Sequence, residues 1–69
     1  MEKMSLRAMS LRALRVNMGL VQKEAAKLID VSNKTLMNWE KGNTYPNQKQ
    51  IEKICEVYGV PYDFIDFNV

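Results

Sequence analysis

The fold is decided by one stretch, residues 21–42, which reads VQKEAAKLIDVSNKTLMNWEKG. Its first part, residues 21–29, has apolar residues on one face and charged residues pointing to water, at the spacing of a helix. The apolar residues are Ala25, Leu28 and Ile29, and the charged residues are Lys23, Glu24 and Lys27. Asp30 and Val31 follow as a very short turn. The pattern therefore predicts one short helix that ends in a tight reversal.

A second helix is predicted over residues 32–41, because Ser32 is a favourable N-cap and Gly42 a favourable stop. The residues on its inner side are Leu36, Trp39 and Glu40. Two helices this short, joined by so short a turn, cannot pack antiparallel and must cross steeply. Ala26 supplies the small side chain where the two backbones meet. The stretch is a helix-turn-helix, an arrangement that pushes one helix out from a globule.

The flanking sequence adds three more predicted helices. The first begins at Ser10 and stops at Gly19, and the fourth runs to Gly59. Their apolar stripes are Leu11, Leu14 and Met18 in the first, and Ile51, Ile54, Cys55 and Tyr58 in the fourth. Pro61 starts a short fifth helix. No stretch alternates with period 2, so we expect a compact all-α domain of five helices over residues 10–66, with an N-terminal extension over 1–9 and an end over 67–69.

The N-terminal part contains a tandem repeat, MSLRA at residues 4–8 and again at 9–13. Five residues are too few for a solenoid repeat. A local duplication or an upstream start accounts for it, and the alternative is an arm that contacts DNA or a partner.

Composition excludes several classes of protein. The 69 residues suffice for one small domain, and the net charge is +2, although residues 1–55 hold ten basic against five acidic residues, a charge of +5. One cysteine and no histidine leave no intramolecular disulfide, few zinc sites and no histidine-dependent catalysis. We expect no enzyme activity, cofactor or metal. With no signal peptide or membrane span in the sequence, the cytosol is the expected compartment.

The chain resembles the lambda-repressor/Cro-like (XRE-type) helix-turn-helix DNA-binding family from Ser10 to about Phe64. The matching segments are Leu11-Arg12-Ala13-Leu14-Arg15, Gly19-Leu20-Val21-Gln22, Ala25-Ala26, Val31-Ser32, Leu36, Trp39-Glu40-Lys41-Gly42, Pro46 and Gly59-Val60-Pro61. Two positions depart from the family pattern. Val21 stands where Ser or Thr usually caps the second helix, and Asp30 stands where glycine usually makes the turn.

The resemblance implies that the helix over residues 32–41 enters the major groove of B-DNA. The expected base contacts are Asn33, Lys34, Met37 and Asn38. Asn38 would pair with adenine, Lys34 with guanine, and Met37 would cover a thymine methyl group. The alternative for these residues is an ordinary solvated helix face.

The resemblance also implies contacts to the DNA backbone and a structural ion pair. The expected phosphate contacts are Gln22, Ser32, Lys41, Asn43, Thr44 and Tyr45. Arg15 and Glu40 are expected to form a partly buried ion pair with a structural role, and Trp39 and Cys55 are expected in the core.

The C-terminal stretch holds more large apolar residues than a short helix can bury against its own domain. These residues are Tyr62, Phe64, Ile65 and Phe67, and they are candidate dimer contacts. Repressors of this type read two half-sites as two-fold dimers, so a homodimer is expected. In the alternative, Phe64 and Ile65 complete the core of the monomer.

These observations predict a sequence-specific double-stranded DNA-binding transcriptional regulator, and specifically a repressor that occludes a promoter. The alternative is a protein-interaction module on the same fold, antitoxin-like or inhibitor-binding, with little affinity for DNA.

Overall fold

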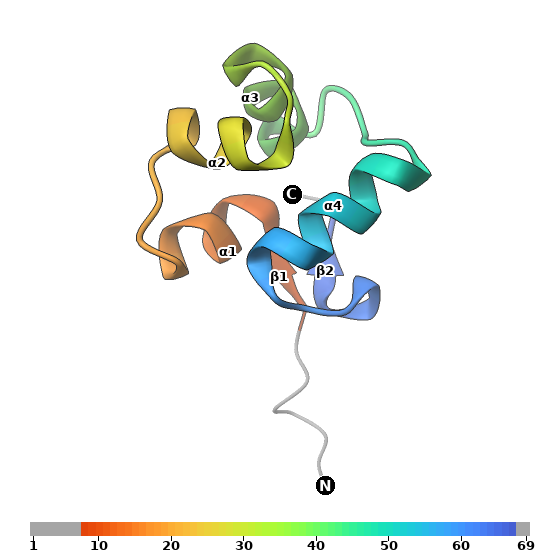
Figure 1. Cartoon of the computed structure of the whole chain (residues 1–69). Coiled ribbons are helices and arrows are strands. Elements are labelled where there is room, and N and C mark those ends of the chain that lie inside the picture. Colours follow the sequence, from red (N-terminus) through yellow and green to blue (C-terminus); the bar gives the residue numbers. More distant parts are fainter. Residues whose placement is uncertain (1–7, 68–69) are drawn as a thin grey trace, which may run out of the picture.

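The computed structural model describes residues 8–67 of the chain (Figure 1). Residues 8–67 form four α-helices, one short 3-10 helix and two very short strands. In chain order they are β1 (Met9–Ser10), α1 (Leu11–Asn17), α2 (Gln22–Ile29), α3 (Asn33–Lys41), α4 (Gln48–Tyr58), η2 (Tyr62–Phe64) and β2 (Ile65–Asp66). Within residues 8–67, no helix has the length and apolar character needed to cross a membrane.

The prediction of a fifth α-helix is wrong. After Pro61 the chain makes only the three-residue 3-10 helix η2, and Ile65 then becomes extended with φ −103° and ψ 126°. Strand β2 pairs in parallel with β1, Met9 opposite Ile65 and Ser10 opposite Asp66. Pairing between segments so distant in sequence leaves no local pattern, and strands of two residues are too short to show alternation.

Met9 therefore belongs to the folded domain, although the sequence analysis assigned it to the N-terminal extension. The first copy of the MSLRA repeat lies outside the described residues except for Ala8, and so do the last two residues of the predicted C-terminal end. In the second copy, Ser10 caps α1, since its side-chain oxygen accepts a hydrogen bond from the Ala13 N–H at 3.1 Å. Leu11 is buried in the core.

The core lies between the four helices and β2. Its buried residues are Leu11, Leu14, Ala25, Ala26, Ile29, Leu36, Trp39, Ile54, Tyr58 and Ile65. Ala25 and Ala26 are both fully enclosed where α2 meets its neighbours, which is the place where a steep helix crossing needs small side chains. Removal of these apolar side chains from water is the main force that holds the helices together.

Two residues expected in the apolar stripes are instead about half exposed, namely Met18 and Leu28. Helix α1 ends at Asn17, so Met18 is its C-cap and no longer follows the helical face. In α2 the buried face is centred between Ala25, Ala26 and Ile29, and Leu28 lies to one side of it.

The turn between α2 and α3 depends on a strained residue. Asp30 has φ 70° and ψ 44°, and among residues 8–67 no other non-glycine residue has a positive φ. This left-handed conformation brings Cβ close to the backbone, a cost that glycine avoids. The short reversal is therefore formed against a local conformational penalty.

We expect Asp30→Gly to raise the free energy of unfolding by about 0.5–1 kcal/mol, because glycine adopts the left-handed conformation without this penalty. Urea denaturation followed by circular dichroism measures the change. Asp30→Ala is the control, since it also removes the carboxylate but keeps Cβ, and it is expected to be less stable than Asp30→Gly. If Asp30→Gly is no more stable than the wild type, the backbone of Asp30 is not strained.

Tyr58 holds a buried hydroxyl that has no hydrogen-bond partner within residues 8–67. The residue is 4% exposed. Burial raises the pKa of Tyr58 to about 12, the nearby Glu40 carboxylate acts in the same direction, and Arg15 acts against it. The unfolded chain, with its ordinary pKa near 10, releases the phenolic proton at lower pH than the folded protein does.

We expect Tyr58→Phe to raise the free energy of unfolding at pH 7 by about 1 kcal/mol, because an unpaired buried hydroxyl is lost and the ring is kept. The exposed Tyr62 gives a control, and Tyr62→Phe should leave this stability unchanged.

The same variant tests the pH dependence. Between pH 10 and about 12 the folded wild type binds more protons than the unfolded chain, so its stability falls as the pH rises through this range. Tyr58→Phe should lose that part of the alkaline destabilisation. Identical alkaline unfolding curves for the two proteins would contradict the assigned pKa.

Candidate nucleic-acid interface

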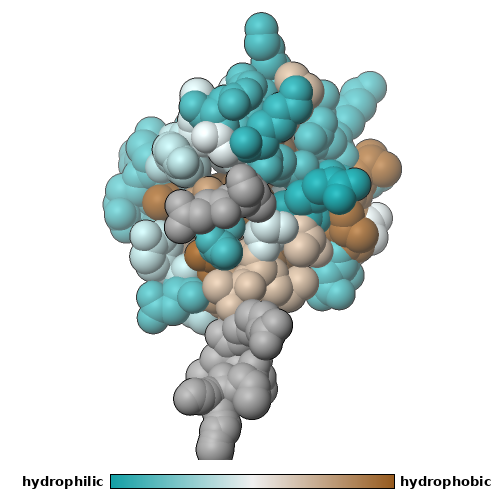
Figure 2. Space-filling view, turned by 180° about the vertical axis from the view of Figure 1, so that it is seen from behind, coloured by the Kyte–Doolittle hydropathy of each residue, from teal (hydrophilic) through white to brown (hydrophobic). Residues whose placement is uncertain are grey.

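Helix α3 is fixed to the domain by its inner face and leaves a polar outer face. Leu36 and Trp39 are buried on the inner face. The predicted base contacts lie on the outer side, where Asn33 and Lys34 are exposed, and Met37 and Asn38 are partly buried. Seen from behind in Figure 2, the end of the molecule that carries α3, uppermost in both views, is covered mainly by hydrophilic side chains. This end offers hydrogen-bonding groups without a large apolar surface.

The loop after α3 holds the Asn38 side chain. Asn43 Nδ2 donates to Asn38 Oδ1 at 3.3 Å, and the Asn43 N–H donates to the Asn38 carbonyl oxygen at 2.9 Å. The Asn38 amide group still has its own N–H donors and the second lone pair of Oδ1 for another partner. Asn43 therefore orients a predicted base contact, a role that sequence reasoning missed because it placed Asn43 only at phosphate.

An ion pair joins α1 to the end of α3. Arg15 Nε donates to Glu40 Oε2 at 2.7 Å and Arg15 Nη2 to Glu40 Oε1 at 3.1 Å, while Nη1 donates to the Leu20 carbonyl oxygen at 2.9 Å. The two side chains are only 11% and 5% exposed. The hydrogen bond with Glu40 raises the pKa of Arg15, partly offset by burial. This two-pronged contact fixes α3 relative to α1 and the turn before α2.

Gln22 extends this network to the start of α2, since its Nε2 donates to Glu40 Oε1 at 3.1 Å. Its second amide hydrogen is left for another acceptor. Val21 has no side-chain oxygen to cap α2, so only the reciprocal half of a capping box forms: the Glu24 carboxylate accepts from the Val21 N–H at 3.0 Å. Glu24 places a negative charge in the first turn of α2.

The other predicted phosphate contacts divide into two groups. Ser32 is the N-cap of α3, where its Oγ accepts from the Thr35 N–H at 3.0 Å and donates to Thr35 Oγ1 at 2.9 Å. The remaining residues, Lys41, Asn43, Thr44 and Tyr45, are exposed at the end of α3 and in the following loop. They form a rim beside α3 that faces solvent.

The four C-terminal candidates for dimer contacts do not form one exposed surface. Ile65 is 7% exposed and lies in the core, as the alternative prediction for this residue expected. Phe64 and Phe67 are partly buried against the core. Tyr62 is 57% exposed, with its ring centroid 6.2 Å from that of Phe67. Pairing of β2 with β1 turns Ile65 inward.

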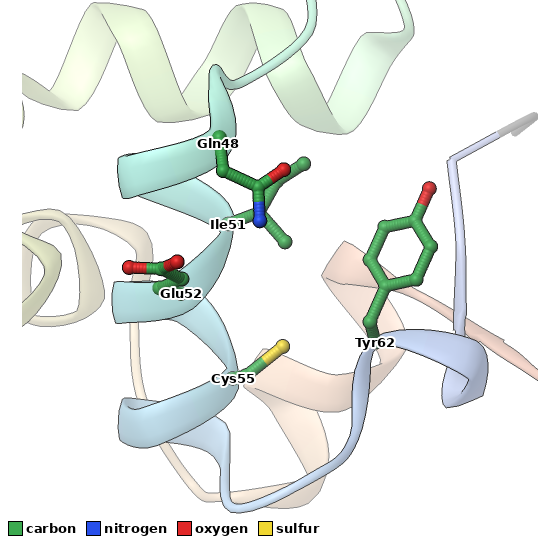
Figure 3. Close-up of a pocket in the computed structure, with 5 residues that line it drawn as sticks. All are labelled: Gln48, Ile51, Glu52, Cys55 and Tyr62. Atoms are coloured by element: carbon green, nitrogen blue, oxygen red, sulfur yellow. The ribbon is translucent and has the colours of Figure 1, made fainter.

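Tyr62 forms one wall of a groove of about 430 Å³ against α4. Figure 3 shows Tyr62 across from Gln48, Ile51 and Cys55 of α4, with the Cys55 sulfur directed into the space between them, while the Glu52 carboxylate points away from Tyr62. Cys55 is thus partly buried on a groove wall. Burial raises the pKa of its thiol, which favours the protonated, less reactive form. Among the described residues, no three metal-binding side chains of the His, Cys, Asp and Glu types lie together.

Residues 11–65 match the Helix-turn-helix family, and the chain belongs to this family. Over 51 residues it is 41% identical to the transcriptional repressor RstR of the cryptic phage CTXphi from Vibrio cholerae. The aligned part is 74% of this chain and 46% of the relative, so the chain spans about half the length of that curated protein. Solved structures give no significant match.

We expect Arg15→Met and Glu40→Met each to lower the free energy of unfolding by about 3–5 kcal/mol, because each leaves one charge without its partner in a largely buried site. The double variant should lose less unfolding free energy than the two single variants added together, since it leaves neither charge unpaired. Thermal unfolding of the four proteins gives the coupling energy.

The exposed pair of Lys53 and Glu56, 3.8 Å apart on α4, is the control. Lys53→Met should change the stability by less than about 1 kcal/mol. An Arg15→Met protein with the thermal stability of the wild type would exclude a structural role for the Arg15–Glu40 pair.

Proposed function

We propose that the protein is a sequence-specific double-stranded DNA-binding transcriptional regulator that reads bases with α3. The observation that carries this proposal is the placement of α3 in a chain of the Helix-turn-helix family: Leu36, Trp39 and the Glu40 ion pair fix its inner side, and its outer side is polar. A rigid helix with such a face fits the major groove, which is about 12 Å wide and rich in donors and acceptors.

Each residue on the outer face has a proposed role. Asn38, oriented by Asn43, pairs with N6 and N7 of adenine, and Lys34 donates to O6 and N7 of guanine. Asn33 reaches a base edge from the first turn of α3, and Met37 covers a thymine methyl group.

Contacts to the DNA backbone fix the position of α3. In this proposal Gln22 uses its free amide hydrogen for a phosphate, and the rim formed by Lys41, Asn43, Thr44 and Tyr45 contacts a second stretch of backbone. Ser32 contributes its hydroxyl at the N-terminus of α3, where the helix dipole favours an anion. These contacts give affinity and register and do not discriminate between sequences.

The regulator is proposed to act as a repressor and as a homodimer. Its relative RstR is described as a transcriptional repressor, and a domain that covers a promoter represses by occlusion. Two copies related by a two-fold axis read two half-sites about one helical turn apart. Tyr62, with Phe64 and Phe67 beside it, is the proposed contact between the copies.

The groove between α4 and Tyr62 favours a second candidate function, a protein-interaction module with little affinity for DNA. Ionic strength separates the two candidates. Binding to DNA weakens steeply as salt rises because counterions are released from the phosphates, whereas an apolar contact in the groove does not show this loss.

Selection from a library of random duplexes at two salt concentrations, followed by sequencing of the bound pool, tests the proposal. A palindromic consensus with half-sites one helical turn apart is expected. Binding without a consensus contradicts sequence specificity, and no binding at low salt favours the protein-interaction module.

We expect Asn38→Ala to relax the preference at one base pair by about 1–3 kcal/mol, because one paired amide is lost. Gln22→Ala should weaken binding to all duplexes alike, since Gln22 contacts only the backbone. Dissociation constants for the selected duplex and for its single-base variants measure the loss of base preference in Asn38→Ala and the uniform loss of affinity in Gln22→Ala. Asn17→Ala, an exposed amide at the end of α1, is the control without effect. The reverse pattern for Asn38 and Gln22 would refute this placement of α3.

A further inference from the structure

A second concave surface lies beside α3 and adjoins the proposed DNA contacts Ser32 and Asn33. It is a hollow of about 520 Å³ between α2 and the first turn of α3. Its lining residues are Lys23, Ala26, Lys27, Asp30, Val31, Ser32 and Asn33. We propose that Lys23 and Lys27 form a phosphate-binding site in this hollow for the backbone of the DNA strand that passes α3. This inference rests on the proposed function and assigns two residues that the sequence analysis left as solvated.

The two lysines are placed to act together. They are four residues apart on α2, so they project from the same side of the helix with Cβ atoms about 5–6 Å apart. Both are exposed, and within residues 8–67 neither forms an ion pair. Two free ammonium groups on flexible stems can reach successive phosphates of one strand.

The shape of the hollow allows a DNA strand to approach. Ala26 and Val31, whose side chains are short, line the hollow together with the two lysines. Ser32 and Asn33, at the start of α3, also line it. Helix α3 has no acidic residue in its first turn, and its N-terminus adds positive potential on that side.

Continuity with the base-reading surface identifies the ligand as duplex DNA. Asn33 lines the hollow and is also one of the proposed base contacts. When Asn33 lies at a base edge, the phosphates that border the groove on its side lie next to the hollow. The ligand is therefore the same phosphodiester backbone that flanks the bases read by α3.

Asp30 is the one acidic group in the hollow, and its charge opposes the binding of a phosphate. Removal of the Asp30 charge should therefore change DNA binding in the opposite direction to removal of a lysine charge. Asp30→Asn keeps a residue that tolerates the left-handed conformation and removes the negative charge, so it should strengthen binding to DNA while the lysine variants weaken it.

The experiment uses the full chain and a random-sequence duplex about three helical turns long, with binding measured over a series of salt concentrations. Lys23→Gln and Lys27→Gln should each reduce the slope of log K against log salt by about 0.9 per bound protomer, and the double variant by about twice as much. Asp30→Asn should bind more tightly than the wild type at every salt concentration. Glutamine is a good helix former, and circular dichroism verifies that α2 is intact.

Lys53→Gln is the matched control, because Lys53 is paired with Glu56 on α4 and should leave the slope unchanged. A double Lys23/Lys27 variant with the wild-type slope overturns this inference and leaves the proposed function standing. A wild-type protein that binds no duplex at low salt overturns both. Equal losses of slope for Lys53→Gln and Lys23→Gln would show only a dependence on net charge and would also overturn the site.

Discussion

The ion pair between Arg15 and Glu40 is the interaction on which the candidate interface depends. It joins three parts of the chain, because the Arg15 guanidinium also binds the Leu20 carbonyl oxygen and Glu40 also accepts from Gln22. The same contact keeps the Glu40 carboxylate neutralised beside a surface proposed to meet DNA. Trp39, buried next to Glu40 in sequence, completes the attachment of α3 to the core. The exposed face of α3 can therefore be polar without loss of its position.

The positions of the α-helices could be predicted from local sequence, whereas the pairing of the two short strands could not. Capping residues and apolar spacing predicted the four α-helices closely, including the stop at Gly42 and the small residue Ala26 at the crossing. The pairing of β1 with β2 was missed, because it joins the two ends of the domain and neither strand has a pattern of its own. Asp30 was expected at the reversal, in a position where the family usually has glycine, and its backbone is left-handed in the structure.

The residues of the candidate site could be predicted from the sequence, but most of the hydrogen bonds between their side chains could not. Family resemblance pointed to Arg15 and Glu40 together, and their side chains lie in contact in the structure. The bonds from Gln22 to Glu40 and from Asn43 to Asn38 depend on side-chain directions that spacing alone does not determine. Whether an apolar residue near the C-terminus faces the core or a partner also depends on distant contacts.

The most direct measurement is a titration of the 15N-labelled protein with duplex DNA, in which NMR monitors the chemical-shift changes of the backbone amides and of the nitrogen-bearing side chains. Binding through α3 predicts the largest changes at Asn33, Lys34 and Asn38 and at the first turn of α2, with little change along α4. Shifts concentrated in α4 and around Tyr62, with α3 unaffected, would contradict the central claim that α3 is the surface that reads DNA.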